Sequence, residues 1–406
     1  TTSAPDSGRV VCYHTSWAAY RPEAKFVAKD INPYLCTHLI YSFAQVLVDS
    51  ATIAPGDAWQ DIDNHWQFPN DQQRNGSAED YKNFVYLLQD IDKVFREEAA
   101  ASGKAKMMLV ISIPGNTLLI ESGYDLPNLQ KYVEFMNVLC YDYHFAYDPA
   151  VYHHSPLYPL TNEVEGSGHE NEGVNADATI KFILAKGVTP SKLNLGIPLY
   201  GRSLELFDEN ENTLGSPATG QGAQGKATRE DGYRAYNEIC KNVKDGWKVV
   251  HVNETAMGPY AYKGNQWVGY DDEGSARRKG EYAKKSGLGG ISFWAIDQDD
   301  FSAACGPRTY PLIKAAREGF FRIPICTTSE LCWSCISCYS ATSGRLMRSR
   351  SSRGSQNAPG RQSPPGARAG EVVEFRSKVV PSSFTTSSAG VYDNHTAPLP
   401  DIRYEQ

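Results

Sequence analysis

Two carboxylates and an amide stand close together between residues 61 and 67, and their types restrict the chemistry they could perform. Asp61 and Asp63 are one residue apart, so on a β-strand their side chains would share a face. A third carboxyl group close behind them could act as a general acid, because like charges and partial burial raise its pKa. Gln67 stands there instead, and an amide has no ionisable proton to give to a leaving oxygen. The segment therefore has the form of a carboxylate-based acid–base site that lacks its acid, which argues against catalysis by this route.

The composition predicts a large globular body with an acidic balance of charge. The 406 residues, 41% hydrophobic and 11% aromatic, suffice for one large α/β barrel or two ordinary domains. The net charge is −7 although six arginines and no acid lie between residues 345 and 368. An acidic body argues against nucleic-acid binding, and no apolar run reaches the roughly 18–20 residues that span a bilayer. No signal peptide is visible at Thr1, where the polar sequence is typical of a processed or truncated start.

Short apolar runs alternate with amphipathic stretches over residues 9–320, which predicts a parallel sheet covered by helices. Strands are expected at 10–13, 37–44, 107–113, 135–142, 193–198 and 290–296. Helices are expected at 80–98, 176–186 and 275–286. Residues 203–272 break this rhythm with Gly-rich turns and aromatic strands, which predicts a small α+β insertion on the barrel. Over residues 321–406, Ser, Arg, Pro and Gly dominate without a period, as is typical of a disordered tail.

Nine cysteines and several glycosylation sequons, such as Asn253-Glu-Thr, favour an extracellular, secreted protein. We predict disulfides between Cys12 and Cys36 and between Cys240 and Cys305. Cys140 lies in an apolar run and is expected to be a small core residue. The four remaining cysteines, between residues 326 and 338, form overlapping C-x-x-C pairs with no histidine at zinc-finger spacing. The sequence therefore predicts no metal site, and it indicates no cofactor.

Four segments resemble glycoside hydrolase family 18, the chitinases and chitinase-like lectins. In chain order they are 11–17 with 35–44 for strands one and two, 136–144 (MNVLCYDYH) for strand six, 196–203 (GIPLYGRS) for strand seven and 289–301 (GGISFWAIDQDDF) for strand eight. The resemblance covers most of residues 9–320. It implies a (β/α)8 barrel, a TIM barrel, with the ligand groove at the carboxyl ends of the strands. It also implies substrate-assisted hydrolysis, in which a Glu protonates the glycosidic oxygen and the substrate's own acetamide attacks the anomeric carbon.

The strand-four motif of this family is D-G-x-D-x-D-W-E-(Y/F)-P, and the chain departs from it. Asp61 and Asp63 match its D-x-D if two residues are inserted before Trp66, and Gln67 then takes the place of the acid. Without a gap, Asp63 matches the middle Asp and His65 the last one. Either alignment loses the glutamate, and the motif's glycine is missing as well.

The family's third strand, with its S-x-G-G signature, has no counterpart in the chain. Only 21 residues separate Ala44 from Trp66, whereas two βαβ crossovers take roughly 30 residues each. We therefore expect one repeat to be missing and the barrel to be incomplete, with an open edge or an altered closure.

The resemblance also implies which residues would contact a sugar. Tyr141 and Asp142 match the sixth-strand pair that binds the acetamide and supports the intermediate. The other implied sugar-binding positions are Tyr13, Phe43, Trp66, Tyr200, Arg202 and Trp294. Trp294 would lie beneath the sugar at the cleavage subsite, where a flat indole suits the apolar face of a pyranose. Without the resemblance, the aromatics at 13, 43 and 294 could equally be core residues.

Three functions remain open from the sequence. The first is a secreted, monomeric chitin-binding protein of the chitinase family that is weakly active or inactive, with chitin or chito-oligosaccharides as ligand and no nucleic acid or membrane as partner. The second is an active secreted chitinase that hydrolyses β-1,4-linked N-acetylglucosamine polymers, with another carboxylate in place of the acid. Glu79 is the nearest glutamate, but we expect it to cap a helix. The third is a non-functional partial gene product.

Overall fold

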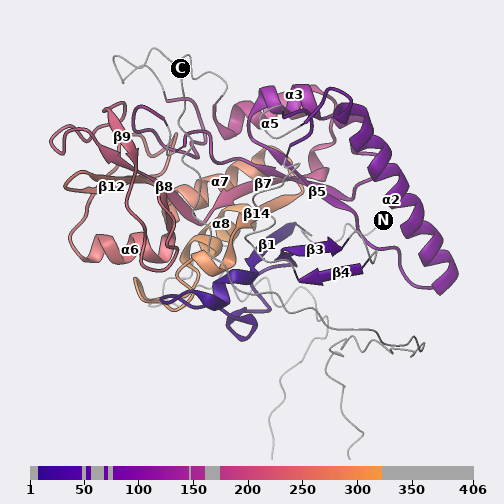
Figure 1. Ribbon diagram of the computed structural model, residues 1–406, viewed down its shortest axis with the longest axis horizontal. Coiled ribbons are helices and arrows are strands. Elements are labelled where there is room, and N and C mark those ends of the chain that lie inside the picture. Colours follow the sequence, from indigo (N-terminus) through magenta and orange to yellow (C-terminus); the bar gives the residue numbers. More distant parts are fainter. Residues whose placement is uncertain are drawn as a thin grey trace, which may run out of the picture. The chain divides into compact units, whose positions relative to one another are not determined.

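The computed structural model describes residues 8–47, 52–55, 68–71, 76–145, 148–160 and 174–321, with the backbone alone for 44–47 and 52–55 (Figure 1). Four of the predicted site residues, Asp61, Asp63, Trp66 and Gln67, lie outside this part of the chain. So does the predicted tail beyond Phe321.

Six parallel strands form a curled sheet in the order β2-β1-β14-β7-β6-β5, which is part of a (β/α)8 barrel. The strands are β1 (Arg9–Thr15), β2 (His38–Ser42), β5 (Val110–Pro114), β6 (Phe135–Leu139), β7 (Leu193–Pro198) and β14 (Gly290–Trp294). Among the described residues, β2 and β5 are the two edges of this sheet. Two further strands, β3 (Ala44–Leu47) and β4 (Thr52–Pro55), pair with each other as an antiparallel hairpin. The predicted fold class, an incomplete barrel, is confirmed.

The strand boundaries follow the burial pattern of each apolar run. β7 coincides with its prediction, because every residue from Leu193 to Pro198 is buried. The strand expected at 135–142 ends earlier, at Leu139, because the N–H of Tyr141 turns back to the Leu139 carbonyl and Asp142 has a φ of 56°. The strands expected at 107–113, 37–44 and 290–296 are also shorter than predicted, and β5 begins only at Val110.

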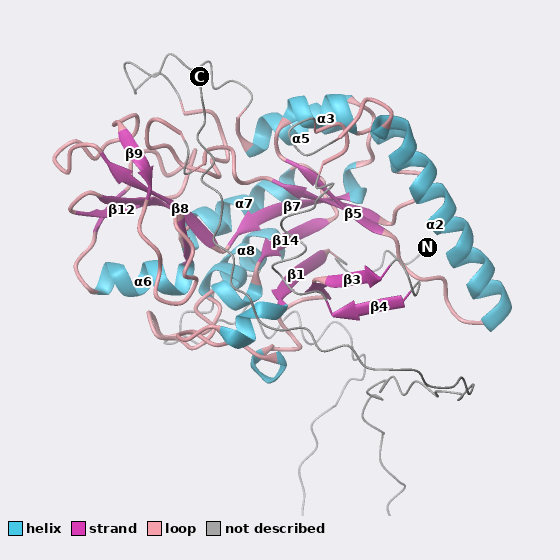
Figure 2. Ribbon diagram, in the orientation of Figure 1, coloured by secondary structure: helices cyan, strands magenta, loops and turns pink. Residues whose placement is uncertain are grey.

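The helices are α2 (Asp80–Ser102), α3 (Thr117–Gly123), α4 (Leu126–Leu129), α5 (Ala176–Ala185), α6 (Tyr236–Lys244), α7 (Glu273–Lys285) and α8 (Pro311–Phe321), shown in cyan in Figure 2. α2 runs past the predicted residue 98 through an alanine-rich turn and ends at Gly103, which adopts the left-handed conformation of a helix C-terminus (φ 69°). α7 begins two residues before its prediction because Asp272 accepts the N–H of Ser275 and caps it. α7 and α8 pack against β7 and β14. No helix in the described ranges combines the length and the apolarity that a membrane crossing requires.

A second, antiparallel sheet covers residues 200–269 and contains β8 (Tyr200–Leu206), β9 (Ala218–Gln221), β10 (Tyr233–Ala235), β11 (Lys248–Val250), β12 (Tyr260–Lys263) and β13 (Gln266–Gly269). Its order is β10-β8-β13-β12-β11, with β9 beside β8. Trp267 and Tyr260 stack in its buried core at a centroid distance of 5.2 Å. The division of the chain into a barrel, an insertion at 203–272 and a tail stays a prediction.

Both predicted disulfides are present. Cys12 of β1 is bonded to Cys36, and Cys240 of α6 is bonded to Cys305. Cys140 is a buried free thiol, as expected, and burial raises its pKa to about 12. Each disulfide closes a loop of the unfolded chain, which stabilises the fold by roughly 2–4 kcal/mol.

Candidate functional site

A carboxylate and a guanidinium form the polar centre of the candidate site. Asp142 follows β6, and Arg202 of β8 binds both of its oxygens, with Nε at 2.7 Å from Oδ1 and Nη2 at 2.9 Å from Oδ2. Such a two-pronged contact is strong and directional. Burial raises the pKa of Asp142, but the charge of Arg202 and the contact with His154 outweigh it and hold the pKa well below its usual range. Asp142 is therefore ionised at neutral pH and acts as a hydrogen-bond acceptor.

Three tyrosines surround this pair. The Tyr141 ring meets Tyr200 edge-on at 6.0 Å, and Tyr200 stacks on Tyr233 at 4.4 Å. The Arg202 guanidinium lies over both stacked rings, 5.4 Å from the Tyr200 centroid and 5.2 Å from that of Tyr233. Burial raises the pKa of all three phenols well above its usual value. They remain protonated and can donate hydrogen bonds.

A second group, of aromatic rings, lies at or near the carboxyl ends of β1, β2 and β14, which belong to the same sheet as β6. Trp294, at the end of β14, has its ring 5.4 Å from Tyr13 and stacks with Phe43 at 5.9 Å. Phe43 also stacks with Trp17 at 6.1 Å and is 41% exposed. Trp17 and Trp294 are partly exposed, and Tyr13 is buried. Partly exposed flat rings suit the apolar face of an amphipathic ligand such as a sugar.

A chain of hydrogen bonds through the sheet interior holds Tyr13. Its hydroxyl shares a hydrogen bond with Ser112 Oγ at 2.7 Å and accepts one from Asn137 Nδ2 at 2.7 Å. Asn194 donates to Asn137 Oδ1 at 2.9 Å, and Arg9 donates to Asn194 Oδ1 at 3.0 Å. The sequence reasoning missed this chain. The two asparagines inside apolar strand runs were its available signal, because a buried amide needs partners.

His154 is a second residue that the sequence reasoning missed. Its Nε2 donates to the Tyr200 carbonyl at 3.2 Å, and its Nδ1 lies 3.4 Å from Asp142 Oδ1. Burial lowers the pKa of His154, although Asp142 opposes this. The signal in the sequence was the His153-His154 pair soon after the predicted sixth strand, since a buried histidine must find polar partners.

The structure thus brings together Tyr141, Asp142, Tyr200 and Arg202 as one cluster, and Tyr13, Phe43 and Trp294 as another. One expectation was wrong. Glu79 occupies the N-cap position of α2, but its exposed side chain makes no capping bond. Asp80 accepts the N–H of Ser77 instead, at 2.8 Å.

Within the described ranges, one group of ligand-type side chains is close enough together to hold a metal ion, and it is unsuited to do so. It consists of Cys240, Cys305 and Asp300. The two sulfurs form a disulfide, and the carboxylate accepts the N–H groups of Ala304 and Cys305 at 2.8 Å each.

Comparisons with known proteins agree with this fold. A family model described as glycosyl hydrolases family 18 matches residues 61–299. Chitotriosidase-1 of Mus musculus is 32% identical to the chain, over 77% of this chain and 78% of its own length. Chitinase-3-like protein 2 of Homo sapiens is 30% identical, over 76% of this chain and 92% of its own length.

Solved structures of chitinases and of a pseudo-chitinase also resemble the chain. Catalytic domain 2 of the Ostrinia furnacalis Group II chitinase has a TM-score of 0.70 at 27% identity, covering 78% of this chain and 97% of that one. Human YKL-39, described as a pseudo-chitinase with retained chitooligosaccharide binding properties, has a TM-score of 0.67 at 29% identity, covering 77% and 99%. The similar proteins include chitinases and a pseudo-chitinase.

Proposed function

We propose that this chain, which belongs to glycosyl hydrolase family 18, binds polymers of N-acetylglucosamine and hydrolyses them weakly or not at all. The observation that carries the proposal is the ionised Asp142–Arg202 pair beside protonated tyrosines, together with the partly exposed ring of Trp294 at the carboxyl end of β14 in the same sheet as β6. N-acetylglucosamine has an amide and an apolar ring face, and this arrangement offers a partner to each. An extracellular location accords with the two disulfides.

The polar contacts can be assigned from hydrogen-bonding capacity. A carboxylate has about four acceptor positions, and Arg202 occupies two of those on Asp142, so an acetamide N–H can use another. The protonated Tyr141 hydroxyl can donate to the acetamide carbonyl. The sugar ring would stack on Trp294, which supplies most of the affinity.

Hydrolysis needs a proton donor, and Gln67, Asp142 and Glu79 are each unsuited to that role. Gln67, which takes the place of the family's acid in the sequence, has no ionisable proton. Asp142 is ionised at neutral pH because Arg202 and His154 lower its pKa. Glu79 is exposed at the start of α2. Loss of a general acid typically lowers the rate ~10²–10⁴-fold.

Calorimetric titration with an N-acetylglucosamine hexamer tests the binding. We expect weak, saturable binding that Trp294→Ala abolishes and Asp142→Ala reduces by less. Trp247→Ala is the matched control, because Trp247 is a half-buried tryptophan directly before β11 that contacts Arg234. A protein that is folded by circular dichroism yet gives no saturable signal would reject the proposal, as would a Trp294→Ala variant that binds like the parent.

Release of a fluorogenic aglycone from a chito-oligomer tests the hydrolysis. Turnover should be at or near background, and Gln67→Glu alone should restore little if the strand-three repeat is missing. Turnover at ordinary chitinase rates by the purified parent would replace the proposal with the alternative of an active chitinase.

A further inference from the structure

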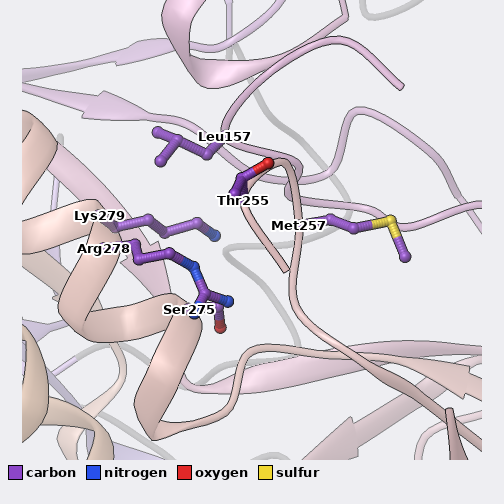
Figure 3. A pocket seen from close by; sticks show the side chains of 6 residues that line it. All are labelled: Leu157, Thr255, Met257, Ser275, Arg278 and Lys279. Atoms are coloured by element: carbon purple, nitrogen blue, oxygen red, sulfur yellow. The ribbon is translucent and has the colours of Figure 1, made fainter. Parts of the chain in front are cut away.

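A buried ion pair lies behind the candidate site. Lys279 of α7 donates to Asp271 Oδ2 at 2.5 Å, and the two side chains are 2% and 0% exposed. Lys279 Nζ also donates to Ser155 Oγ at 2.7 Å. Figure 3 shows Lys279 extending from α7 beside Arg278, with Leu157 and Thr255 opposite. The pocket between these side chains is too shallow to enclose a water molecule, so Lys279 faces protein groups and no ligand cavity.

Ser155 connects the Lys279–Asp271 pair to the residues that follow β6. Its hydroxyl accepts from Lys279 and donates to the Cys140 carbonyl at 2.6 Å, directly before the site residues that follow β6. Its N–H donates to His153 Nδ1 at 3.1 Å, and His153 Nε2 donates to the Tyr270 carbonyl at 2.9 Å. Hydrogen bonds to neighbouring elements thus hold both Ser155 and His153 in place.

His154 lies between these two residues in the sequence, and its imidazole lies beside Asp142 of the candidate site. Its carbonyl accepts the N–H of Tyr143 at 2.9 Å, its Nε2 donates to Tyr200, and its Nδ1 lies 3.4 Å from Asp142. Lys279 and Asp271 therefore hold Ser155, which is bonded through the backbone to His154, and the imidazole of His154 lies beside the site carboxylate.

We propose that Lys279 is a positioning residue, which together with Asp271 holds Ser155 and thereby fixes the orientation of the His154 ring against Asp142. A buried ion pair adds little net stability compared with a packed apolar pair, so its effect is expected on geometry. The consequence for ligand affinity rests on the proposed function, whereas the orientation of His154 does not.

The first test needs no ligand and reads the ring nitrogens of His154 by long-range ¹⁵N–¹H NMR, assigned with a His154→Gln variant. The parent should show a protonated Nε2, because that atom donates to the Tyr200 carbonyl, and the Nδ1 signal reports whether that atom carries a proton toward Asp142. Ser155→Ala removes the link and leaves the ion pair, and we expect the His154 signals to move toward those of a solvent-averaged imidazole. Lys279→Met combined with Asp271→Leu removes the pair without leaving a lone charge and should have the same effect.

Ser203→Ala is the matched control, because Ser203 is a buried serine whose hydroxyl has no hydrogen-bond partner. Its His154 signals should coincide with those of the parent. If the signals of Ser155→Ala also coincide with the parent, the positioning role is overturned, and this variant decides the question even if the double variant does not fold.

The second test is titration of the same proteins with the N-acetylglucosamine hexamer. Affinity should fall about tenfold in Ser155→Ala, the loss that removal of a supporting hydrogen bond produces around metal ligands, and should not change in Ser203→Ala. Unchanged affinity in Ser155→Ala would overturn the effect on ligand binding. If the parent itself does not bind, the proposed function fails and the NMR result alone decides the positioning role.

Discussion

The central strand β7 and the edge strand β2 belong to one parallel sheet but lie in different surroundings. Every residue of β7 is buried between β14 and β6. On β2, Leu39 and Tyr41 are 49% and 50% exposed, although both are apolar and face the side that β1 buries with Cys12. The apolar strand β7 is thus covered on both faces, whereas β2 is only partly covered.

This difference separates site residues on strands with packed neighbours from those at the edge of the sheet. Asp142, Arg202 and Trp294 follow or belong to β6, β8 and β14, whose neighbours are present in the described chain. Phe43, by contrast, directly follows β2 and is itself partly exposed. The residues that we propose to contact the acetamide therefore lie on strands whose neighbours are described, whereas the segment in which the sequence departs from the family lies outside the described residues.

Two leucines of this sheet give the largest expected difference. Leu195→Ala on β7 opens a cavity in a fully buried position and should lower the free energy of unfolding by about 3–4 kcal/mol. Leu39→Ala on β2 removes a half-exposed side chain and should cost less than about 1 kcal/mol. Urea denaturation of both variants measures this. If both variants lost the same free energy of unfolding, Leu39 would be buried in solution as well, and β2 and β7 would not differ in burial.

A buried histidine beside the site should make stability depend on pH. Burial lowers the pKa of His153 to about 3, and its Nδ1 already accepts the Ser155 N–H, so the folded protein resists protonation there. The unfolded chain binds this proton below a pH of about 6.5, so the free energy of unfolding falls as the pH falls from there toward 3. This contribution amounts to on the order of 3 kcal/mol between pH 7 and pH 4.

Comparison of the parent with His153→Gln isolates that contribution, because the amide keeps one donor and one acceptor without a charge. The comparison is needed because Asp299 has the opposite effect on the pH dependence of stability. Burial raises the pKa of Asp299 to about 7. Its folded form takes up a proton first, which adds stability as the pH falls from 7 toward 4. Parallel pH profiles of parent and variant would contradict the assignment to His153.

The sequence predicted the buried strands and the disulfides but missed most polar contacts between strands. β7 was placed correctly because its mostly apolar run is buried along its whole length. Both disulfides were predicted, one of them between residues 65 positions apart, because cysteine can form this bond only with another cysteine. The contact of Asp142 with Arg202, 60 positions apart, was one of many possible pairs of opposite charges. No periodicity contains that information, nor the positive φ that ends the strand before Asp142. The roles of Asp61, Asp63, Trp66 and Gln67 remain predictions from the sequence.

The smallest expected effect concerns the charge balance of the site. Arg202→Met keeps much of the side-chain volume and leaves Asp142 without its guanidinium. Removing one partner of a fully buried pair costs about 3–5 kcal/mol, but the Asp142 side chain is 26% exposed and water replaces part of the interaction. We expect a loss of about 2 kcal/mol in the free energy of unfolding at pH 7, measured by urea denaturation. Lys181→Met is the control, because its ion pair with Asp177 involves a lysine that is 72% exposed, so its loss should leave the free energy of unfolding almost unchanged.

The pH dependence of this loss identifies Asp142 as its source. The folded pKa of Asp142 lies below its unfolded value, so the stability that the pair contributes is present above a pH of about 4 and disappears as the pH falls through the folded pKa. In the Arg202→Met variant, Asp142 takes up its proton at higher pH and becomes a neutral buried group. The two proteins should therefore converge in stability as the pH falls toward 3. A difference that stays constant from pH 7 to pH 3 would instead point to the lost packing of Arg202 against Tyr200 and Tyr233, and the site would then owe its order to stacked rings more than to charge.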